Sequence, residues 1–405
     1  MSREPTASAS SVVAAPASPR RATVVVTPRA VQRVRAGHPW IYRSDLTQVD
    51  ADAGDVVRVI GRRGGALGYG LFSDRSVIAL RMVTRSDRPP DTTFWRERLA
   101  HAVRYREQLS IDATAYRLVH GEGDRLPSLI VDRYAETLVV QTLSQGMDRR
   151  LPLICELLAD LVRPRGILAR NDPKVRGLEG LDRTVELRYG DVPEVVEVRE
   201  GPVTLLVEPW TGQKTGLFLD QRENRAAAAR YATGRGLDCF SYTGAFALRM
   251  APSCADVTAI EVSDDAVARV ARHAERNGIT NIRAIAGNAF DVLRELDRRG
   301  EHFETIVLDP PAFAKNRGAT ARAQAGYREI NLRAFRLLTR GGTLITSSCS
   351  YHVDEPTFGR IVAEAAAHAR AEVIVVEKRR QGRDHPVLAG APETSYLKCL
   401  VLRKI

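Results

Sequence analysis

The stretch Thr305-Ile306-Val307-Leu308-Asp309-Pro310-Pro311-Ala312-Phe313 carries the strongest fold signal in this chain. A short apolar run ends there at an acid and two prolines. A second stretch, Thr343-Leu344-Ile345-Thr346-Ser347-Ser348-Cys349-Ser350, has the same form with a cysteine after the run. Apolar runs that stop at polar or turn residues are typical of buried parallel strands. Because ligands bind at the carboxyl edge of such sheets, we expect Asp309 and Cys349 to face one pocket.

Alternating strand and helix patterns surround these two stretches from about Val203 onward. Further strands are expected at Leu237–Phe240, Val257–Glu261 and Ile282–Ile285, with helical stretches between them. This order predicts a doubly wound, mostly parallel α/β sheet. Two more strand-like runs, 372–378 and 395–403, are joined by a link too short for a helical crossover. They therefore predict an antiparallel pair at one edge of the sheet.

The rest of the chain predicts two smaller domains and a tail ahead of this α/β domain, which we assign to residues 201–405. Residues 22–97 hold short β-rich runs punctuated by glycine, which indicates a small all-β barrel. Residues 98–200 combine helical and strand-like patterns, which indicates an α+β connecting domain. Residues 1–21 are rich in alanine, serine and proline, so we expect a disordered tail there.

Charge and cysteine usage narrow the class of protein. The chain has 60 Lys+Arg against 49 Asp+Glu, a net charge of +11. This balance favours a polyanionic partner, nucleic acid first, with a merely solvated basic surface as the alternative. Five widely spaced cysteines without a CxxC pair argue against a disulfide framework or a zinc site, and for a cytoplasmic protein without metal. No stretch approaches the roughly 18 apolar residues of a membrane span, so we expect no membrane partner.

Three features in order predict a site for a nucleoside cofactor. Ser241-Tyr242-Thr243-Gly244 follows the first strand, and Gly244 permits a tight turn. The segment is not GxGxxG, which disfavours a dinucleotide. Glu261 ends the second strand, where an acid can accept hydrogen bonds from ribose hydroxyls. Asn288 follows the third strand and could read an adenine edge.

Together with Asp309-Pro310-Pro311, these features resemble a class I S-adenosylmethionine methyltransferase. Upstream, Gly212–Arg222 (GQKTGLFLDQR) resembles a segment of one bacterial family, the PUA-containing large-subunit (23S) rRNA cytosine-5 methyltransferases. In that family Asp238–Gly244 matches the first motif, and Asn288 stands where aspartate is more usual. The resemblance implies S-adenosylmethionine as cofactor. The implied cofactor-binding residues are Lys214, Thr215, Phe218, Gln221, Asp238, Phe240, Ser241, Tyr242, Thr243, Gly244, Glu261, Val262, Asn288, Ala289 and Asp309.

The segment Arg33–Tyr42 (RVRAGHPWIY) resembles the opening of a PUA domain, a small RNA-binding barrel. It mixes basic and aromatic side chains, which RNA-binding modules use for phosphate contact and base stacking. The resemblance implies RNA contacts by Arg33, Arg35, His38 and Trp40. The alternative is that Trp40 and Tyr42 are core residues.

The acid and the thiol suit methylation of cytosine at carbon 5. A thiolate that adds to carbon 6 makes carbon 5 nucleophilic, and an acid at nitrogen 3 stabilises the adduct. We assign Cys349 as the nucleophile and Asp309 as the acid, with Pro310, Pro311 and Phe313 as substrate contacts. The alternative for Cys349 is a buried structural thiol. The two prolines fix the backbone there and remove its donors.

Three functions are weighed. The first is an rRNA cytosine-5 methyltransferase acting on the large-subunit RNA. The second is an enzyme of the same fold that methylates an amino group of guanine or adenine, for which Asp-Pro-Pro and an aromatic residue would suffice without a thiol. The third is an RNA-binding ribosome assembly factor without turnover, against which the intact Asp309, Glu261 and Cys349 argue. A homodimer is one assembly state that we consider.

Overall fold

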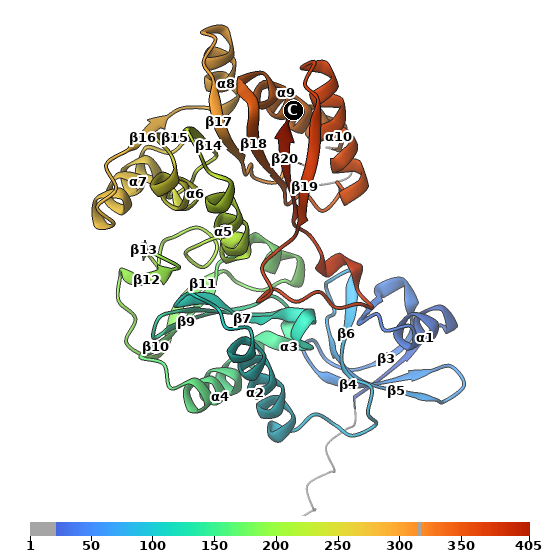
Figure 1. Ribbon diagram of the computed structural model, residues 1–405. Helices are drawn as coiled ribbons and strands as arrows, with labels where there is room; N and C mark the ends of the chain where they lie inside the picture. The colour runs from blue at the N-terminus through green and yellow to red at the C-terminus, as the bar shows by residue number, and fades with distance from the viewer. Residues whose placement is uncertain (1–21, 314–317, 319) are drawn as a thin grey trace, which may run out of the picture.

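The computed structural model describes residues 22–313, 318 and 320–405, so the tail predicted over residues 1–21 lies outside the described residues. Figure 1 shows three bodies in chain order: a small sheet structure in blue, a central body in teal and green, and an α/β body in yellow to red. No helix of the described ranges has the length and apolar character that a membrane crossing requires.

The first body is a six-stranded sheet with one helix. The strand order is β2-β6-β5-β4-β1-β3, and β1 pairs parallel with β4. The strand pattern did not predict helix α1. The helix begins after Thr27, whose side chain accepts a hydrogen bond from the Ala30 N–H, and Pro28 lies in its first turn. Its apolar face packs Ala30 and Val34 into the core of this body. The elements are β1 (Thr23–Val26), α1 (Pro28–Arg35), β2 (Trp40–Tyr42), β3 (Leu46–Asp50), β4 (Val56–Gly61), β5 (Ala66–Phe72) and β6 (Ile78–Thr84).

The central body is a five-stranded mixed sheet with two main helices, followed by a hairpin. The sheet order is β11-β10-β9-β8-β7, and α2 and α4 pack against it through a core that contains Trp95, Leu99 and Leu158. The elements are α2 (Thr92–Gln108), β7 (Ala115–His120), β8 (Leu129–Tyr134), β9 (Thr137–Thr142), α3 (Gln145–Asp148), α4 (Leu151–Val162), β10 (Gly166–Asn171), β11 (Thr184–Gly190), β12 (Val196–Glu200) and β13 (Val203–Val207).

The third body is a seven-stranded sheet in the order β16-β15-β14-β17-β18-β20-β19. The first five strands are parallel, and β20 runs antiparallel to both β18 and β19. The prediction of a doubly wound sheet with an antiparallel edge pair is therefore confirmed. The elements are α5 (Arg222–Tyr231), β14 (Arg235–Cys239), α6 (Ala245–Met250), β15 (Asp256–Glu261), α7 (Asp264–Arg276), β16 (Ile282–Ala286), α8 (Ala289–Arg298), β17 (Phe303–Leu308), α9 (Thr320–Leu337), β18 (Leu338–Ser348), α10 (Glu355–His368), β19 (Val373–Arg379) and β20 (Lys398–Lys404).

Apolar residues cover both faces of this sheet. Leu293, Phe335 and Phe358 from helices α8, α9 and α10 belong to one core cluster. Ala228, Ala247 and Val270 from helices α5, α6 and α7 belong to a second. The inner strands of this sheet are covered on both faces and open only at their ends, so polar residues after these strands gather at the carboxyl edge.

Candidate active site

A cavity of about 460 Å³ opens at the carboxyl ends of β14, β15, β17 and β18. Its size falls within the range of about 300–1,000 Å³ that is usual for small-molecule sites. Asp309 and Cys349, which end two neighbouring parallel strands, both line it. The other lining residues are Gln213, Lys214, Leu217, Phe218, Asp220, Gln221, Arg225, Phe240, Ser241, Tyr242, Thr243, Ala245, Phe246, Glu261, Val262, Pro310, Pro311, Ala312 and Leu397.

The turn after β14 is tightly wound. Phe240 and Tyr242 have φ angles of 64° and 51°, in the left-handed region that non-glycine residues rarely adopt. Gly244 has φ 81° and starts helix α6, and a Cβ there would lie 2.9 Å from Val270. This glycine therefore meets two needs, the backbone conformation and the close approach of helix α7. Strain at such a turn is common at functional sites.

Glu261 anchors this turn through its carboxylate. The Tyr242 N–H donates to Oε2 at 2.9 Å, and the Val262 and Ser263 N–H groups donate to Oε1 at 2.8 and 3.2 Å. Three backbone donors fix the orientation of the carboxylate at the cavity wall. Oε2, which accepts one of these bonds, keeps a further lone pair for a hydroxyl group, so the residue suits the ribose of a nucleoside.

Asp309 is held at the end of β17 by a side chain from the segment before the core. The Gln221 Nε2 atom donates to Asp309 Oδ1 at 2.6 Å. Burial and the nearby carboxylate of Asp220 raise the pKa of Asp309 to about 6, against the hydrogen bond from Gln221 and the charge of Lys214. A carboxyl group with a pKa in this range can give or take a proton near neutral pH.

Cys349 differs from the other four cysteines, which are all buried, because its side chain is only partly covered. Its Sγ atom lies 4.0 Å from the Pro310 carbonyl oxygen. Burial and the charge of Asp309 raise the pKa of this thiol to about 11. The following residue is fixed by Lys398, whose Nζ donates to the Ser350 carbonyl at 2.8 Å. The thiol is thus accessible but mostly protonated at neutral pH.

Asp220 is a cavity residue to which the sequence analysis gave no role. Its Oδ2 accepts hydrogen bonds from the Tyr396 hydroxyl at 2.7 Å and from Lys214 Nζ at 3.2 Å. Burial alone would raise its pKa, but the charges of Lys214 and His385 hold it well below the usual range. Asp220 belongs to the segment GQKTGLFLDQR, and its place in that segment is the one sequence feature that could have indicated a role. No signal could have linked it to Tyr396, which lies far along the chain.

Six of the predicted cofactor and substrate residues do not line the cavity. Thr215 donates to Asp132 Oδ2 at 2.6 Å, inside the central body. Asn288 caps helix α8 by accepting from the Phe290 N–H at 2.9 Å. The carboxyl group of Asp238 is fully buried and accepts from the Ala247 N–H at 3.0 Å, and burial raises its pKa to about 8. The other three are Gly244, Ala289 and Phe313.

The residues predicted to contact RNA are largely engaged within the protein. Arg33 forms an ion pair with Asp45 at 2.7 Å. The His38 Nε2 atom lies 3.3 Å from Glu393, and Trp40 Nε1 donates to Glu122 at 2.9 Å. His38 and Trp40 thus connect the first body to the other two, while Arg35 is exposed at the end of α1.

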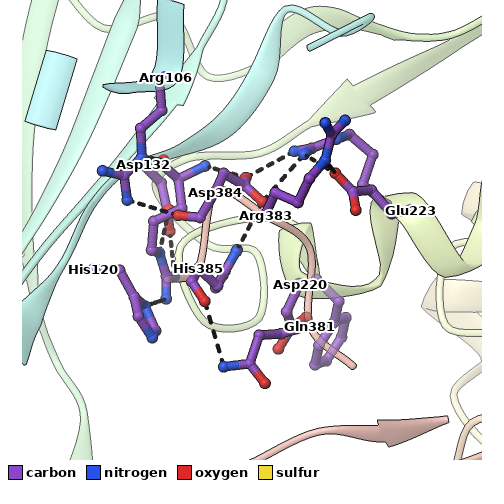
Figure 2. A network of polar contacts seen from close by, with 12 residues as sticks. Arg106, His120, Asp132, Asp220, Glu223, Gln381, Arg383, Asp384 and His385 are labelled. Atoms are coloured by element: carbon purple, nitrogen blue, oxygen red, sulfur yellow. Dashed lines mark hydrogen bonds and ion pairs between the residues drawn. The ribbon is translucent and has the colours of Figure 1, made fainter. Parts of the chain in front are cut away.

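The segment between β19 and β20, residues 380–397, crosses to the central body and is anchored there by buried ionic groups (Figures 1 and 2). Arg222 Nη1 donates to Asp384 Oδ2 at 2.7 Å, and the Arg117 N–H donates to the same oxygen at 2.9 Å. Arg106 donates to the Asp384 carbonyl at 2.7 Å. The anchored segment then delivers Tyr396 and Leu397 to the cavity.

Comparisons with known proteins agree with this arrangement. Residues 24–85 match the model of a PUA-like domain, and residues 175–403 match that of an S-adenosylmethionine-dependent methyltransferase. The chain is 40% identical over 379 residues to the ribosomal RNA large subunit methyltransferase I of Tolumonas auensis, covering 91% of this chain and 96% of that protein. It is 38% identical to the protein of the same name from Aeromonas salmonicida, covering 90% of this chain and 95% of the relative.

Two solved structures share the fold over nearly the whole chain. The crystal structure of SMU.776 complexed with SAH has a TM-score of 0.83 at 20% identity, covering 95% of this chain and 100% of that one. A SAM-dependent methyltransferase from Streptococcus mutans has a TM-score of 0.81 at 19% identity, with the same coverage. At these identities the likeness extends to the fold alone.

Proposed function

The chain belongs to the ribosomal RNA large subunit methyltransferase I family, and on that premise we propose that it methylates carbon 5 of a cytosine in large-subunit rRNA. The observation that carries the proposal is the meeting of Asp309 and Cys349 in one cavity, at the ends of adjacent strands. A methyltransferase that acts on an exocyclic amine needs no thiol. An accessible cysteine beside the acid therefore favours carbon 5.

The cavity fits S-adenosylmethionine in size and in chemistry. Glu261, oriented by three backbone N–H groups, would hold the ribose hydroxyls. Phe240 and Val262 would cover the apolar faces of the nucleoside. Lys214 and Gln221 would bind the other, polar end of the S-adenosylmethionine molecule. When bound, S-adenosylmethionine supplies an electrophilic methyl group.

The residues of the chain divide the remaining chemistry between them. The Cys349 thiolate would add to carbon 6 of the cytosine ring, and carbon 5 would then take the methyl group. Once a base has removed the carbon 5 proton, the carbon 5–carbon 6 double bond would re-form and the thiolate would leave. Asp309, with a pKa raised to about 6 by burial and by Asp220, would donate a proton to nitrogen 3 of the ring. The Pro310 carbonyl oxygen, 4.0 Å from the Cys349 sulfur, would accept a hydrogen bond from the exocyclic amino group of the cytosine.

Methyl transfer to large-subunit rRNA that lacks the modification tests this proposal, with the product located by mass spectrometry. We expect 5-methylcytosine at one position. RNA that carries 5-fluorocytidine there should trap the enzyme covalently through Cys349, because fluorine cannot leave as the carbon 5 proton does. A product methylated on an amino group of guanine or adenine would replace the proposal with the second function. The absence of any transfer, together with retained RNA binding, would support the assembly-factor function.

We also propose that the protein forms a homodimer through β11. This edge strand exposes Val185 and Leu187 on one face, at 39% and 47%, while a bulge at Arg188 turns Tyr189 to the other face. In a two-fold antiparallel pairing of this edge with its copy, Val185 and Leu187 of the two copies would lie on the same face and cover one another. Light scattering should give a dimer for the wild type and a monomer for Leu187→Arg. A monomeric wild type would overturn this assembly.

A further inference from the structure

A second cavity, of about 260 Å³, lies where all three bodies of the chain meet. The first body contributes the α1–β2 loop and the end of β6, the central body contributes α2 and the turn after β7, and the β19–β20 segment contributes Leu388. Three arginines line it: Arg85, Arg98 and Arg125. The cavity is separate from the one that contains Asp309 and Cys349.

The three guanidinium groups have no acidic partner among the residues that the structure describes. Within the described chain, no carboxylate lies at ion-pair distance from any of them, and Glu122, the acid that lines the cavity, accepts from the Trp40 indole N–H. Neighbouring arginines are paired: Arg96, on the same helix as Arg98, lies 2.6 Å from Asp160, and Arg88 lies 3.3 Å from Asp91. The cavity therefore concentrates positive charge that the protein neutralises elsewhere in this region.

Arg98 and Arg125 also repel each other. Burial, and next the charge of Arg125, lower the pKa of the half-buried Arg98. Like charges that converge on one concave site cost free energy in the free protein. An anion bound between them would remove that cost, and guanidinium groups match phosphate oxygens in geometry.

We propose that this cavity binds a phosphate group of the RNA backbone and so anchors the substrate away from the reacting base. This inference rests on the proposed function, because it takes RNA as the substrate. The β19–β20 segment lines both cavities, since Leu388 lies at this second cavity and Leu397 at the candidate active site. RNA bound along this segment would contact the arginines and the catalytic cavity together. The residues predicted from the PUA resemblance are less suited to this role, since Arg33 is already paired with Asp45.

The test compares two double variants that each remove two positive charges. Arg98→Ala with Arg125→Ala removes the proposed site, and Arg88→Ala with Arg96→Ala is the matched control from the paired arginines nearby. Binding of a large-subunit rRNA transcript is measured by filter binding over a range of salt concentrations. Loss of one phosphate contact should make the slope of log K against log salt less negative by about 0.7, the single-strand value. The control should leave the slope near that of the wild type.

The outcomes separate this inference from the proposed function. Equal slopes for the two double variants would overturn it, because the arginines would then act only through net charge. A second outcome would also overturn this inference. If inorganic phosphate binds the wild type to saturation and does not compete with RNA, the cavity is a site for a free anion. Unchanged affinity of both variants for S-adenosylmethionine shows that the fold is intact. If the wild type does not bind RNA at all, the proposed function itself fails.

Discussion

The thiol of Cys349 should react slowly with alkylating agents in the free enzyme, and the reaction should accelerate when Asp309 is changed to Asn. Burial and the Asp309 carboxylate raise the pKa of this thiol to about 11. Only the thiolate is alkylated, so the rate follows the ionised fraction. Iodoacetamide labelling at a series of pH values, with the modified peptide quantified by mass spectrometry, measures this pKa directly.

The expected rate can be worked out from the shift. At about pH 8, a thiol of pKa ~11 is roughly 0.1% ionised, against roughly a quarter for an ordinary cysteine. A more basic thiolate is also a stronger nucleophile, and this raises its alkylation rate about tenfold, which offsets part of the difference in ionised fraction. Labelling of Cys349 should therefore be about 10–30-fold slower than that of a model thiol. Its rate should still be rising at about pH 10.

The Asp309→Asn variant tests the electrostatic cause. The pKa of Asp309 is about 6, so above that pH the carboxylate is ionised and disfavours the thiolate. Asparagine removes the charge, the thiol pKa should fall, and labelling at a fixed alkaline pH should become faster. Asp291→Asn, an exposed change outside the lining of the cavity, is the control for net charge and should have no effect. A wild-type rate that levels off near pH 8.5, or an Asp309→Asn variant that labels no faster, would refute the reasoning.

Three further predictions concern the chemistry, the cofactor and the stability. Cys349→Ala should abolish methylation and covalent trapping by 5-fluorocytidine RNA, while Cys399→Ala, a change in a buried strand cysteine, should still trap on denaturing gels; an adduct on another cysteine would contradict this. Glu261→Ala should weaken S-adenosylmethionine binding by about 1.5–3 kcal/mol through lost charge-assisted hydrogen bonds, as calorimetry can measure, and an unchanged affinity would remove Glu261 from the ribose site. Asp384→Ala should lower the free energy of unfolding by about 3–5 kcal/mol, because Arg222 loses its buried partner. The charges of His385 and Arg222 lower the pKa of Asp384 against the effect of burial. The ionised carboxylate therefore stabilises the fold at any pH above the unfolded-state pKa of a carboxyl group. This stabilisation should be lost as the pH falls below that pKa, which urea titrations at a series of pH values can measure.

The sequence by itself determined the α/β domain and which residues of it gather at the candidate site. Each parallel strand is a short apolar run with its own turn signal, so the strands at Thr305–Leu308 and Thr343–Thr346 could be read locally, and with them the placement of Asp309 and Cys349 at one edge. The edge pair could be read because its connection was too short for a parallel crossover. These features depend on neighbours in the chain or on a general rule of sheet topology.

Only the tertiary structure decided which polar side chains meet. Tyr396 reaches Asp220, and Trp40 binds Glu122, because the β19–β20 segment and the first body fold back onto the central body. It also decided that Arg85, Arg98 and Arg125 share one cavity. Hydrophobic periodicity reports which face of an element is buried, but not which distant element buries it. A hydrogen bond between residues far apart in sequence leaves no pattern in either segment, and it exists only once packing has brought the two groups together.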